Sequence, residues 1–412
     1  MRRVVVTGLG TINALGLNVD ETFKNAINGV NGIDYIKGFG TSRIKVNIAG
    51  ELKNFNLEDH FDRSEIRRND RVILYGLLAA DEAFKQSKIM DTNFDPYRFG
   101  VYFTSGIGGL DTLESEISVR ATKGPNPMSP FFIPKAIINM PGGAISIKYG
   151  LKGPNTPIVT ACSASTNSIG EAFRNIKHGY IDIAIAGGAE APLSETGIGG
   201  FAAIKALSTT DDPNRASIPF DKERNGFVMG EGSGALILEE YEHAKKRGAN
   251  IIAEIVGYGT TGDAFHITAP DETAEPIAKA IEFALKEANI NYNEVDYINA
   301  HGTSTLLNDK TETLGIKKAF KDHAKNINIS STKSMTGHTL GAAGAIESIF
   351  AIKATKEDII PPTLNLNIPD PELDLNYTPN KAVKRTVNYS VNMNLGFGGH
   401  NAVLIFKKAE GL

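Results

Sequence analysis

Apolar positions recur along the chain in two alternating patterns, one typical of strands and one of helices. Short apolar runs predict strands at residues 3–7, 98–104, 156–159, 181–186, 227–239, 251–258, 295–299, 327–330, 387–394 and 401–406. Between them lie segments with apolar residues at helical spacing, for example Ile169, Ala172, Phe173 and Ile176. The strand and helix rhythm restarts after about residue 250. We therefore predict an α/β fold with two similar halves, residues 1–250 and 251–412, each a mixed, mostly parallel sheet between helices.

Composition argues against several classes of protein. Of the 412 residues, 41% are hydrophobic and 22% are charged, and the net charge is -4, which argues against general nucleic-acid binding. Nothing approaches the ~18 consecutive apolar residues that a membrane span needs. The apolar run after Met1 is too short for a signal peptide. A single cysteine excludes an intrachain disulfide and fits a reducing compartment, so we expect a cytoplasmic protein.

That single cysteine, Cys162, lies where a predicted buried strand (156–159) turns into the helix that carries Ile169 and ends at His178. Free N–H groups and the positive end of the helix dipole favour an anion at such a position, so a thiolate with a lowered pKa is expected there. Its small neighbours leave room for a substrate. A buried structural cysteine is the alternative on these residues alone.

Three further polar stretches follow predicted strands. They are residues 299–305 with His301, residues 331–344 with Lys333 and His338, and the glycine-rich corner 394–401. Loops after strands are where α/β proteins build sites. The two histidines stand 37 positions apart, which matches no short metal-ligand motif, so no metal is expected. A papain-like cysteine and histidine pair is conceivable, but no papain signature surrounds the cysteine.

Three other charged or glycine-rich features must be weighed. Glu347 lies among apolar helix residues and would be costly to bury alone, which makes Lys333 its plausible partner in a structural ion pair. Gly8-Leu9-Gly10 lacks the third glycine of a dinucleotide-binding fingerprint, because position 13 is asparagine. Arginines at positions 63, 67 and 71 share one predicted helical side, with Arg68 beside them, and form either a solvated face or a basic patch.

The motifs together resemble the β-ketoacyl-[acyl carrier protein] synthases of type II fatty acid synthesis, which are thiolase-like condensing enzymes. The resemblance is nearest to their elongating, synthase II branch. It runs almost end to end and is carried by Thr160-Ala161-Cys162-Ser163, His301-Gly302-Thr303-Ser304-Thr305, Lys333-Ser334-Met335-Thr336-Gly337-His338 and Gly396-Phe397-Gly398-Gly399. Leu306 and Lys205 depart from residues common in the family. The fold implied is the thiolase fold, a layered α-β-α-β-α arrangement.

The resemblance implies a role for each of these residues in a decarboxylative Claisen condensation. Cys162 would carry the acyl group, while His301 and His338 would stabilise the enolate from malonyl carrier protein. Lys333 would orient His338. The N–H groups of Cys162 and Phe397 would form the oxyanion hole. Other expected site residues are Thr303 and Thr305 at the pantetheine arm, Gly398 at the entrance, and Ile107 and Phe201 along the acyl tunnel.

The resemblance also implies partners. Acyl and malonyl carrier proteins would bring the substrates on their own phosphopantetheine arms, so no separate cofactor is expected. Carrier proteins are acidic, which makes Arg67, Arg68 and Lys205 the docking candidates. A homodimer is implied by the family alone.

Three other functions remain to be weighed. A condensing polyketide synthase subunit shares the motif chemistry. A non-catalytic chain-length-factor-like partner would lack Cys162, and a degradative thiolase would carry a second cysteine.

Overall fold

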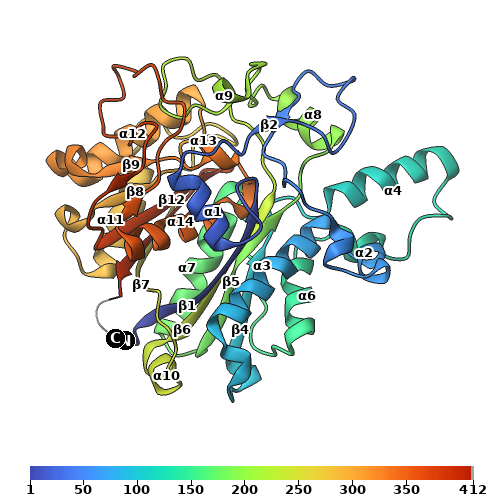
Figure 1. The fold of residues 1–412 in the computed structure, drawn as a ribbon, viewed down its shortest axis with the longest axis horizontal. Coiled ribbons are helices and arrows are strands. Elements are labelled where there is room, and N and C mark those ends of the chain that lie inside the picture. The colour runs from blue at the N-terminus through green and yellow to red at the C-terminus, as the bar shows by residue number, and fades with distance from the viewer. Residues whose placement is uncertain (410–412) are drawn as a thin grey trace.

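The strands form one nine-stranded sheet in the computed structural model, which describes residues 1–409 (Figure 1). The order across the sheet is β4-β5-β6-β1-β7-β13-β12-β8-β9. The bounds of these strands are β1 Val4–Asn13, β4 Phe99–Thr104, β5 Ile183–Glu190, β6 Gly232–Glu240, β7 Ala253–Gly262, β8 Tyr297–Asn299, β9 Asn328–Ser330, β12 Tyr389–Gly396 and β13 His400–Lys408. Two pairs of short strands lie outside the sheet, β2 (Asp34–Tyr35) with β3 (Ile48–Ala49) and β10 (Ile359–Ile360) with β11 (Val383–Lys384).

The sheet consists of a four-stranded half and a five-stranded half with matching strand directions, joined where Val4–Val6 of β1 pairs with β7. In the first half β4, β5 and β1 run in one direction and only β6 opposes them. In the second half β7, β12, β8 and β9 share a direction and only β13 opposes them. The prediction of two similar halves, each mixed and mostly parallel, is confirmed.

Helices cover both faces of each half and give the layered arrangement. Helix α7 (Ala164–Lys177) and helix α14 (Ala343–Glu357) pack against each other in the central layer and share one apolar core with β1, β6 and β7. Helix α3 (Arg71–Ser87) covers the outer face of the first half, and α11 (Glu275–Ala288) and α12 (Leu306–Phe320) cover the second (Figure 1). Within residues 1–409, no helix is long and apolar enough to cross a bilayer.

The remaining helices are shorter and lie mostly around the edges. They are α1 Val19–Ile27, α2 Arg63–Arg68, α4 Leu110–Lys123, α5 Phe132–Ala136, α6 Met140–Tyr149, α8 Glu195–Ala203, α9 Pro213–Ala216, α10 Tyr241–Lys246 and α13 Lys333–Thr336. Two single 3₁₀ turns, η4 (Ala161–Ser163) and η7 (Leu340–Ala342), precede the central helices α7 and α14.

Two local predictions are wrong. Residues 156–159 form no strand, and Val159 is 47% exposed; only the backbone around residue 155 bridges to β4. The arginines at 63, 67 and 71 do not share a helix. Helix α2 ends at Arg68, and Asp70 accepts a hydrogen bond from the Val72 N–H as the N-cap of α3, so a new helix begins at Arg71. Arg71 instead pairs with Asp111 and Glu231.

Candidate active site

Cys162 is the middle residue of turn η4, directly before the first turn of α7. Its predecessor Ala161 has a left-handed backbone with φ of 51°, a conformation that is costly for a residue with a side chain. This tight turn places the sulfur over the N-terminus of the helix, as the sequence predicted. The cysteine is 8% exposed, and it is the one free thiol of the chain.

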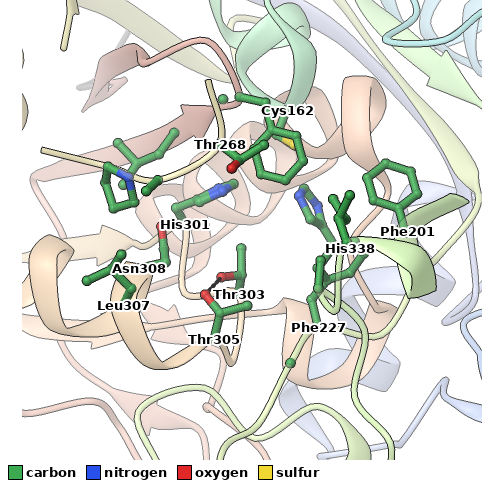
Figure 2. A pocket seen from close by; sticks show the side chains of 18 of the residues that line it. Cys162, Phe201, Phe227, Thr268, His301, Thr303, Thr305, Leu307, Asn308 and His338 are labelled. Carbon is green, nitrogen blue, oxygen red and sulfur yellow. Dashed lines mark hydrogen bonds between the residues drawn. The ribbon is translucent and has the colours of Figure 1, made fainter. Parts of the chain in front are cut away.

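The sulfur lies on the wall of a cavity of about 550 Å³ that also contains both histidines. Figure 2 shows Cys162, His301 and His338 projecting toward a common space from three separate segments, with Thr303 and Thr305 farther along the wall. The sequence-predicted residues that line this cavity are Cys162, Phe201, Lys205, His301, Thr303, Thr305, His338 and Phe397. Residues from both halves of the sheet therefore meet at one site.

The two imidazoles are buried and lie perpendicular to each other, with ring centroids 5.3 Å apart. His301 follows β8, and His338 lies between α13 and η7. Burial lowers the pKa of both rings well below the usual value for histidine, and the positive charge of Lys333 lowers it further. Both imidazoles are therefore neutral near pH 7.

Hydrogen bonds set the tautomer of each ring. The Leu340 N–H donates to His338 Nδ1 over 3.3 Å, and the amide nitrogen of Asn394, which can only donate, lies 3.3 Å from His301 Nδ1. Both Nδ1 atoms are therefore acceptors, and each neutral ring carries its proton on Nε2. The pair thus offers two N–H donors that bear no charge.

A buried chain of polar groups supports His301. Lys333 Nζ forms an ion pair with Glu347 Oε1, and both side chains are almost wholly buried. Asn394 Nδ2 donates to Glu347 Oε2 over 2.6 Å, and Thr166 donates to Asn394 Oδ1 over 2.6 Å. These bonds fix the amide that faces His301. They run from Lys333 to His301, whereas the resemblance implied that Lys333 orients His338.

The sequence predicts a lowered pKa for Cys162, but the structure raises the pKa of this thiol. Burial raises the pKa of the thiol to about 12, although the positive charge of Lys333 and a hydrogen bond from the Phe397 N–H oppose this change. A helix terminus stabilises an anion by at most about 2 kcal/mol, which corresponds to a pKa change of roughly 1.5. Burial therefore outweighs the helix dipole, and the resting sulfur carries its proton.

The other predicted residues divide between the cavity wall and its surroundings. Thr303 and Thr305 line the wall, and their hydroxyl groups are hydrogen-bonded to each other over 2.9 Å. Gly398 is not a lining residue; it has φ of 90° and donates its N–H to the Ile267 carbonyl, which ties the 396–400 corner to the loop after β7. Ile107 does not line the cavity either. It packs in the apolar cluster behind Cys162, together with Phe201.

The three predicted docking residues are separated. Lys205 is exposed at the cavity wall. Arg67 and Arg68 are exposed at the end of α2 and do not line the cavity. Within residues 1–409, neither arginine has an ion-pair partner, so both guanidinium groups are available to solvent.

Sequence reasoning missed two buried carboxylates beside the site. Glu312 accepts from the N–H groups of His301 and Gly302 over 2.6 and 2.7 Å, and burial raises its pKa to about 8. Glu190 ends β5 and accepts from the N–H groups of Gly106 and Gly341 over 2.7 and 2.8 Å. For Glu190 the signal was an acid at the end of an otherwise apolar strand, whereas Glu312 lies among polar residues, so no local pattern marked it. Across residues 1–409, no group of three or more potential metal ligands gathers.

Comparisons with known proteins agree with this geometry. The profile for the N-terminal domain of β-ketoacyl synthases matches residues 1–244, and the profile for the C-terminal domain matches residues 252–367. The chain is 50% identical over 409 residues to 3-oxoacyl-[acyl-carrier-protein] synthase 2 of Staphylococcus aureus, covering 99% of both proteins. It is 47% identical over 410 residues to the protein of that name from Synechocystis sp., again covering 99% of each.

Solved structures show the same fold over the whole length. A β-ketoacyl synthase from Burkholderia phymatum superposes with a TM-score of 0.93 at 34% identity and covers 100% of each chain. A type II polyketide ketosynthase, solved in complex with its acyl carrier protein, superposes with a TM-score of 0.92 at 35% identity and covers 99% of this chain and 100% of its own. The fold is therefore the thiolase-like one expected, and the chain belongs to the β-ketoacyl synthase family.

Proposed function

We propose that this protein catalyses the decarboxylative condensation of a malonyl group with an acyl group held on Cys162, and so elongates fatty acids by two carbons on acyl carrier protein. The observation that carries this proposal is the cavity in which the only cysteine faces two neutral imidazoles whose Nε2–H groups are free to donate. A nucleophile and a pair of uncharged donors are the groups that acyl transfer followed by enolate formation needs.

The first half-reaction is transfer of the acyl group to sulfur. The Cys162 sulfur attacks the thioester carbonyl, its proton passes to the departing pantetheine sulfur, and an acyl-cysteine and a free carrier thiol result. Because burial holds the thiol protonated, proton loss accompanies attack rather than preceding it. The N–H groups of Cys162 and Phe397 form the oxyanion hole, and one such donor typically contributes about 3 kcal/mol to the transition state.

The second half-reaction begins with loss of CO2 from the malonyl thioester. His301 and His338 donate from Nε2 to the thioester oxygen as it gains negative charge. A neutral donor suits this role because its bonds strengthen only as the enolate forms. The enolate carbon then attacks the acyl-cysteine, the β-ketoacyl product leaves on its carrier, and the released sulfur takes a proton from solvent.

Other residues have supporting roles in the proposal. The ion pair of Lys333 and Glu347 fixes Asn394, which positions His301. Thr303 and Thr305 bind the amide groups of the pantetheine arm, and Phe397 with Gly398 controls access to the sulfur. The phosphopantetheine arrives on the carrier protein, so the enzyme needs no cofactor of its own.

Carrier docking is proposed at Arg67, Arg68 and Lys205. A solved relative is a ketosynthase in complex with an acyl carrier protein, which supports such a partner. The basic side chains on a protein of net charge -4 would attract an acidic carrier over a range of about 8 to 10 Å at physiological salt. A cytoplasmic location is part of the proposal, because a reducing compartment keeps the single cysteine free.

A homodimer is proposed on the apolar face beside β4, the edge strand of the sheet. Ile133, Ile147 and Val159 are 58%, 80% and 47% exposed there. The segment around Thr156 pairs with Val101 of β4 on one side only, through Val101 N–H to the Pro154 carbonyl and Thr156 N–H to the Val101 carbonyl. A second copy of the same segment would cover both the open backbone edge and the apolar side chains. Sedimentation of Ile147→Glu should show monomers where the wild type shows dimers.

The fatty-acid role is favoured over the polyketide role by the higher identity to the synthase 2 relatives, 47–50% against 35% for the type II polyketide ketosynthase. A chain-length factor is disfavoured because Cys162 is present at the cavity. The test is Cys162→Gln. It should continue to release CO2 from malonyl carrier protein while forming no condensation product. Loss of both activities with the fold intact, or retention of condensation, would contradict the proposal.

A further inference from the structure

Helix α8 and the residues directly after it line one side of the active-site cavity through Phe201, Ile204 and Lys205, and the helix has an unusual distribution of glycine. Its nine residues include Gly197, Gly199 and Gly200. Glycine in a helix interior is normally tolerated where a neighbour leaves no room for a side chain. Most helical glycines of this protein have that reason, because a Cβ would lie within 3.1 Å of another atom at Gly76, Gly142, Gly170, Gly197, Gly315 and Gly344.

Gly199 and Gly200 lack such a reason. A Cβ at either position would meet nothing within 4 Å, and both residues are exposed. Neither has a positive φ. Two adjacent glycines therefore weaken the helix at its centre without serving packing or backbone geometry within the chain.

The two ends of α8 differ in how firmly they are held. At the N-terminal end Ser194 accepts from the Gly197 N–H as the N-cap, Arg43 pairs with Glu195, and Gly197 packs against the Pro192 carbonyl. At the C-terminal end Lys205 has φ of 56°, the left-handed conformation of a helix cap, and the N–H groups of Lys205 and Ala206 donate back to the Ala202 and Phe201 carbonyls. A hydrogen bond from the Phe227 N–H to the Ala206 carbonyl joins this end to another segment.

The C-terminal half of α8 and the two residues after it carry side chains that close the cavity. Phe201, Ile204 and Lys205 all line it, and the Phe201 ring packs against the rings of Phe227 and Phe397 at centroid distances of 5.5 and 6.4 Å. Behind Cys162 the apolar cluster of Leu193, Ile198 and Leu340 is at most 3% exposed. Leu340 lines the cavity, whereas Leu193, Ile198 and Ile107 do not. The cavity therefore stops near the sulfur, and a long acyl chain needs the wall to move.

We propose that α8 is a hinged wall, in which unwinding at Gly199–Gly200 moves the Phe201–Lys205 half and admits long acyl chains to the apolar cluster behind Cys162. This inference rests on the proposed acyl transfer to Cys162. It predicts which acyl groups depend on movement of the wall. An acetyl group fits the closed cavity, whereas a long saturated chain enters only the open one, so its transfer depends on the free energy of opening. Gly199 and Gly200 are then positions that determine chain-length selectivity without touching the substrate.

The experiment compares Gly199→Ala/Gly200→Ala with wild type, using acetyl and dodecanoyl carrier-protein thioesters and mass analysis of Cys162 acylation over time. Two alanines in place of two helical glycines should slow hydrogen exchange of residues 201–204 by about five- to thirtyfold. Dodecanoyl transfer should slow by a similar factor and acetyl transfer should not change. Ala203→Gly, on the exposed side of the same helix, should change both quantities in the opposite direction.

Gly143→Ala is the matched control, because Gly143 also lies inside a helix and its added Cβ would meet only the Met140 side chain, at ordinary contact distances of 3.7 and 4.0 Å. It should leave both acylation rates at the wild-type level. Equal slowing of acetyl and dodecanoyl transfer by the double alanine variant, or slower exchange with unchanged dodecanoyl transfer, would overturn the hinged wall. Absence of any acyl group on wild-type Cys162 would instead contradict the proposed function.

Discussion

Each half of the sheet has a tight left-handed turn before its central helix, and only the turn of the first half presents a nucleophile. Turns η4 and η7 each precede a central helix, and each begins with a residue in the left-handed region, Ala161 with φ of 51° and Leu340 with φ of 46°. The middle residue is Cys162 in the first half and Gly341 in the second. A Cβ at Gly341 would lie 2.2 Å from the Gly106 nitrogen.

This difference shows that the fold supplies a strained turn in both halves, and that the side chain at the middle position determines whether the turn serves chemistry or packing. In the first half the turn presents sulfur to the cavity. In the second half the turn is packed against the 105–109 loop, and the chemistry comes from His338, two residues before Leu340. The equivalent turns of the two halves therefore contribute to the site in different ways.

The largest expected effect comes from removing the sulfur. Cys162→Ser keeps the turn but offers a hydroxyl, which is far less nucleophilic at neutral pH. We expect condensation with purified acyl and malonyl carrier proteins to fall by at least about 10³-fold. A serine variant that elongates at the wild-type rate would show that the first-half turn is structural, like the second.

The contribution of the second half is measured by His301→Ala. Loss of one preorganised donor to a developing oxyanion should reduce decarboxylation of malonyl carrier protein by about 10²- to 10³-fold. Acylation of Cys162 should change much less, since the donors act on the malonyl thioester. Measuring CO2 release and acylation separately makes the distinction. CO2 release at the wild-type rate would exclude His301 from enolate stabilisation.

Gly341→Ala tests the packing role of the second turn. The added methyl group collides with backbone rather than with a flexible side chain, so we expect a loss of about 1–3 kcal/mol in the free energy of unfolding. Cys162→Ala at the matching position should cost no more than about 1 kcal/mol. Chemical denaturation of both variants provides the comparison. Equal stabilities would mean that the two turns are packed alike.

The protonated state of the first-half sulfur predicts a pH dependence. Only the thiolate reacts with an alkylating agent, and burial raises the pKa of Cys162 to about 12. The alkylation rate should therefore rise about tenfold per pH unit from about pH 6 to about pH 9, without a plateau. A rate that levels off below pH 8 would restore the helix-stabilised thiolate that the sequence suggested.

The smallest effect concerns the surface. Reversing Arg67 and Arg68 to Glu should raise KM for carrier-bound substrates several-fold, which is roughly the effect of losing two exposed charge contacts, and should leave kcat near its wild-type value. The effect should shrink as salt increases. A matched reversal at Arg63, exposed on the same helix, shows whether position or total charge matters. If KM does not change at low salt, α2 is a solvated face.

The sequence predicts the strand and helix rhythm and the motif positions because periodicity and strand-end polar residues are local properties. It also indicates Cys162 at a helix N-terminus, His301 and His338 after strands, and the Lys333–Glu347 pair. The break between Arg68 and Arg71 was visible in principle, since Asp70 is an N-cap residue type. The exposed segment at 156–159 was not, because its apolar residues are typical of a buried strand.

The electrostatics of the site depended on contacts between distant segments. The pKa of Cys162 follows from burial among Leu193, Ile198 and Leu340, which no local pattern reveals. Asn394 reaches His301 from a strand 93 positions away in sequence. For the same reason the motif alone could not show that the bonds from Lys333 lead to His301.

The central claim is that the Cys162 sulfur accepts the acyl group before condensation. The most direct measurement is the mass of the peptide containing Cys162 after the enzyme meets acyl carrier protein without malonyl carrier protein. The account predicts an acyl adduct on that peptide, which disappears as product forms when malonyl carrier protein is added. Product formation by an enzyme whose Cys162 never carries the acyl group would contradict it.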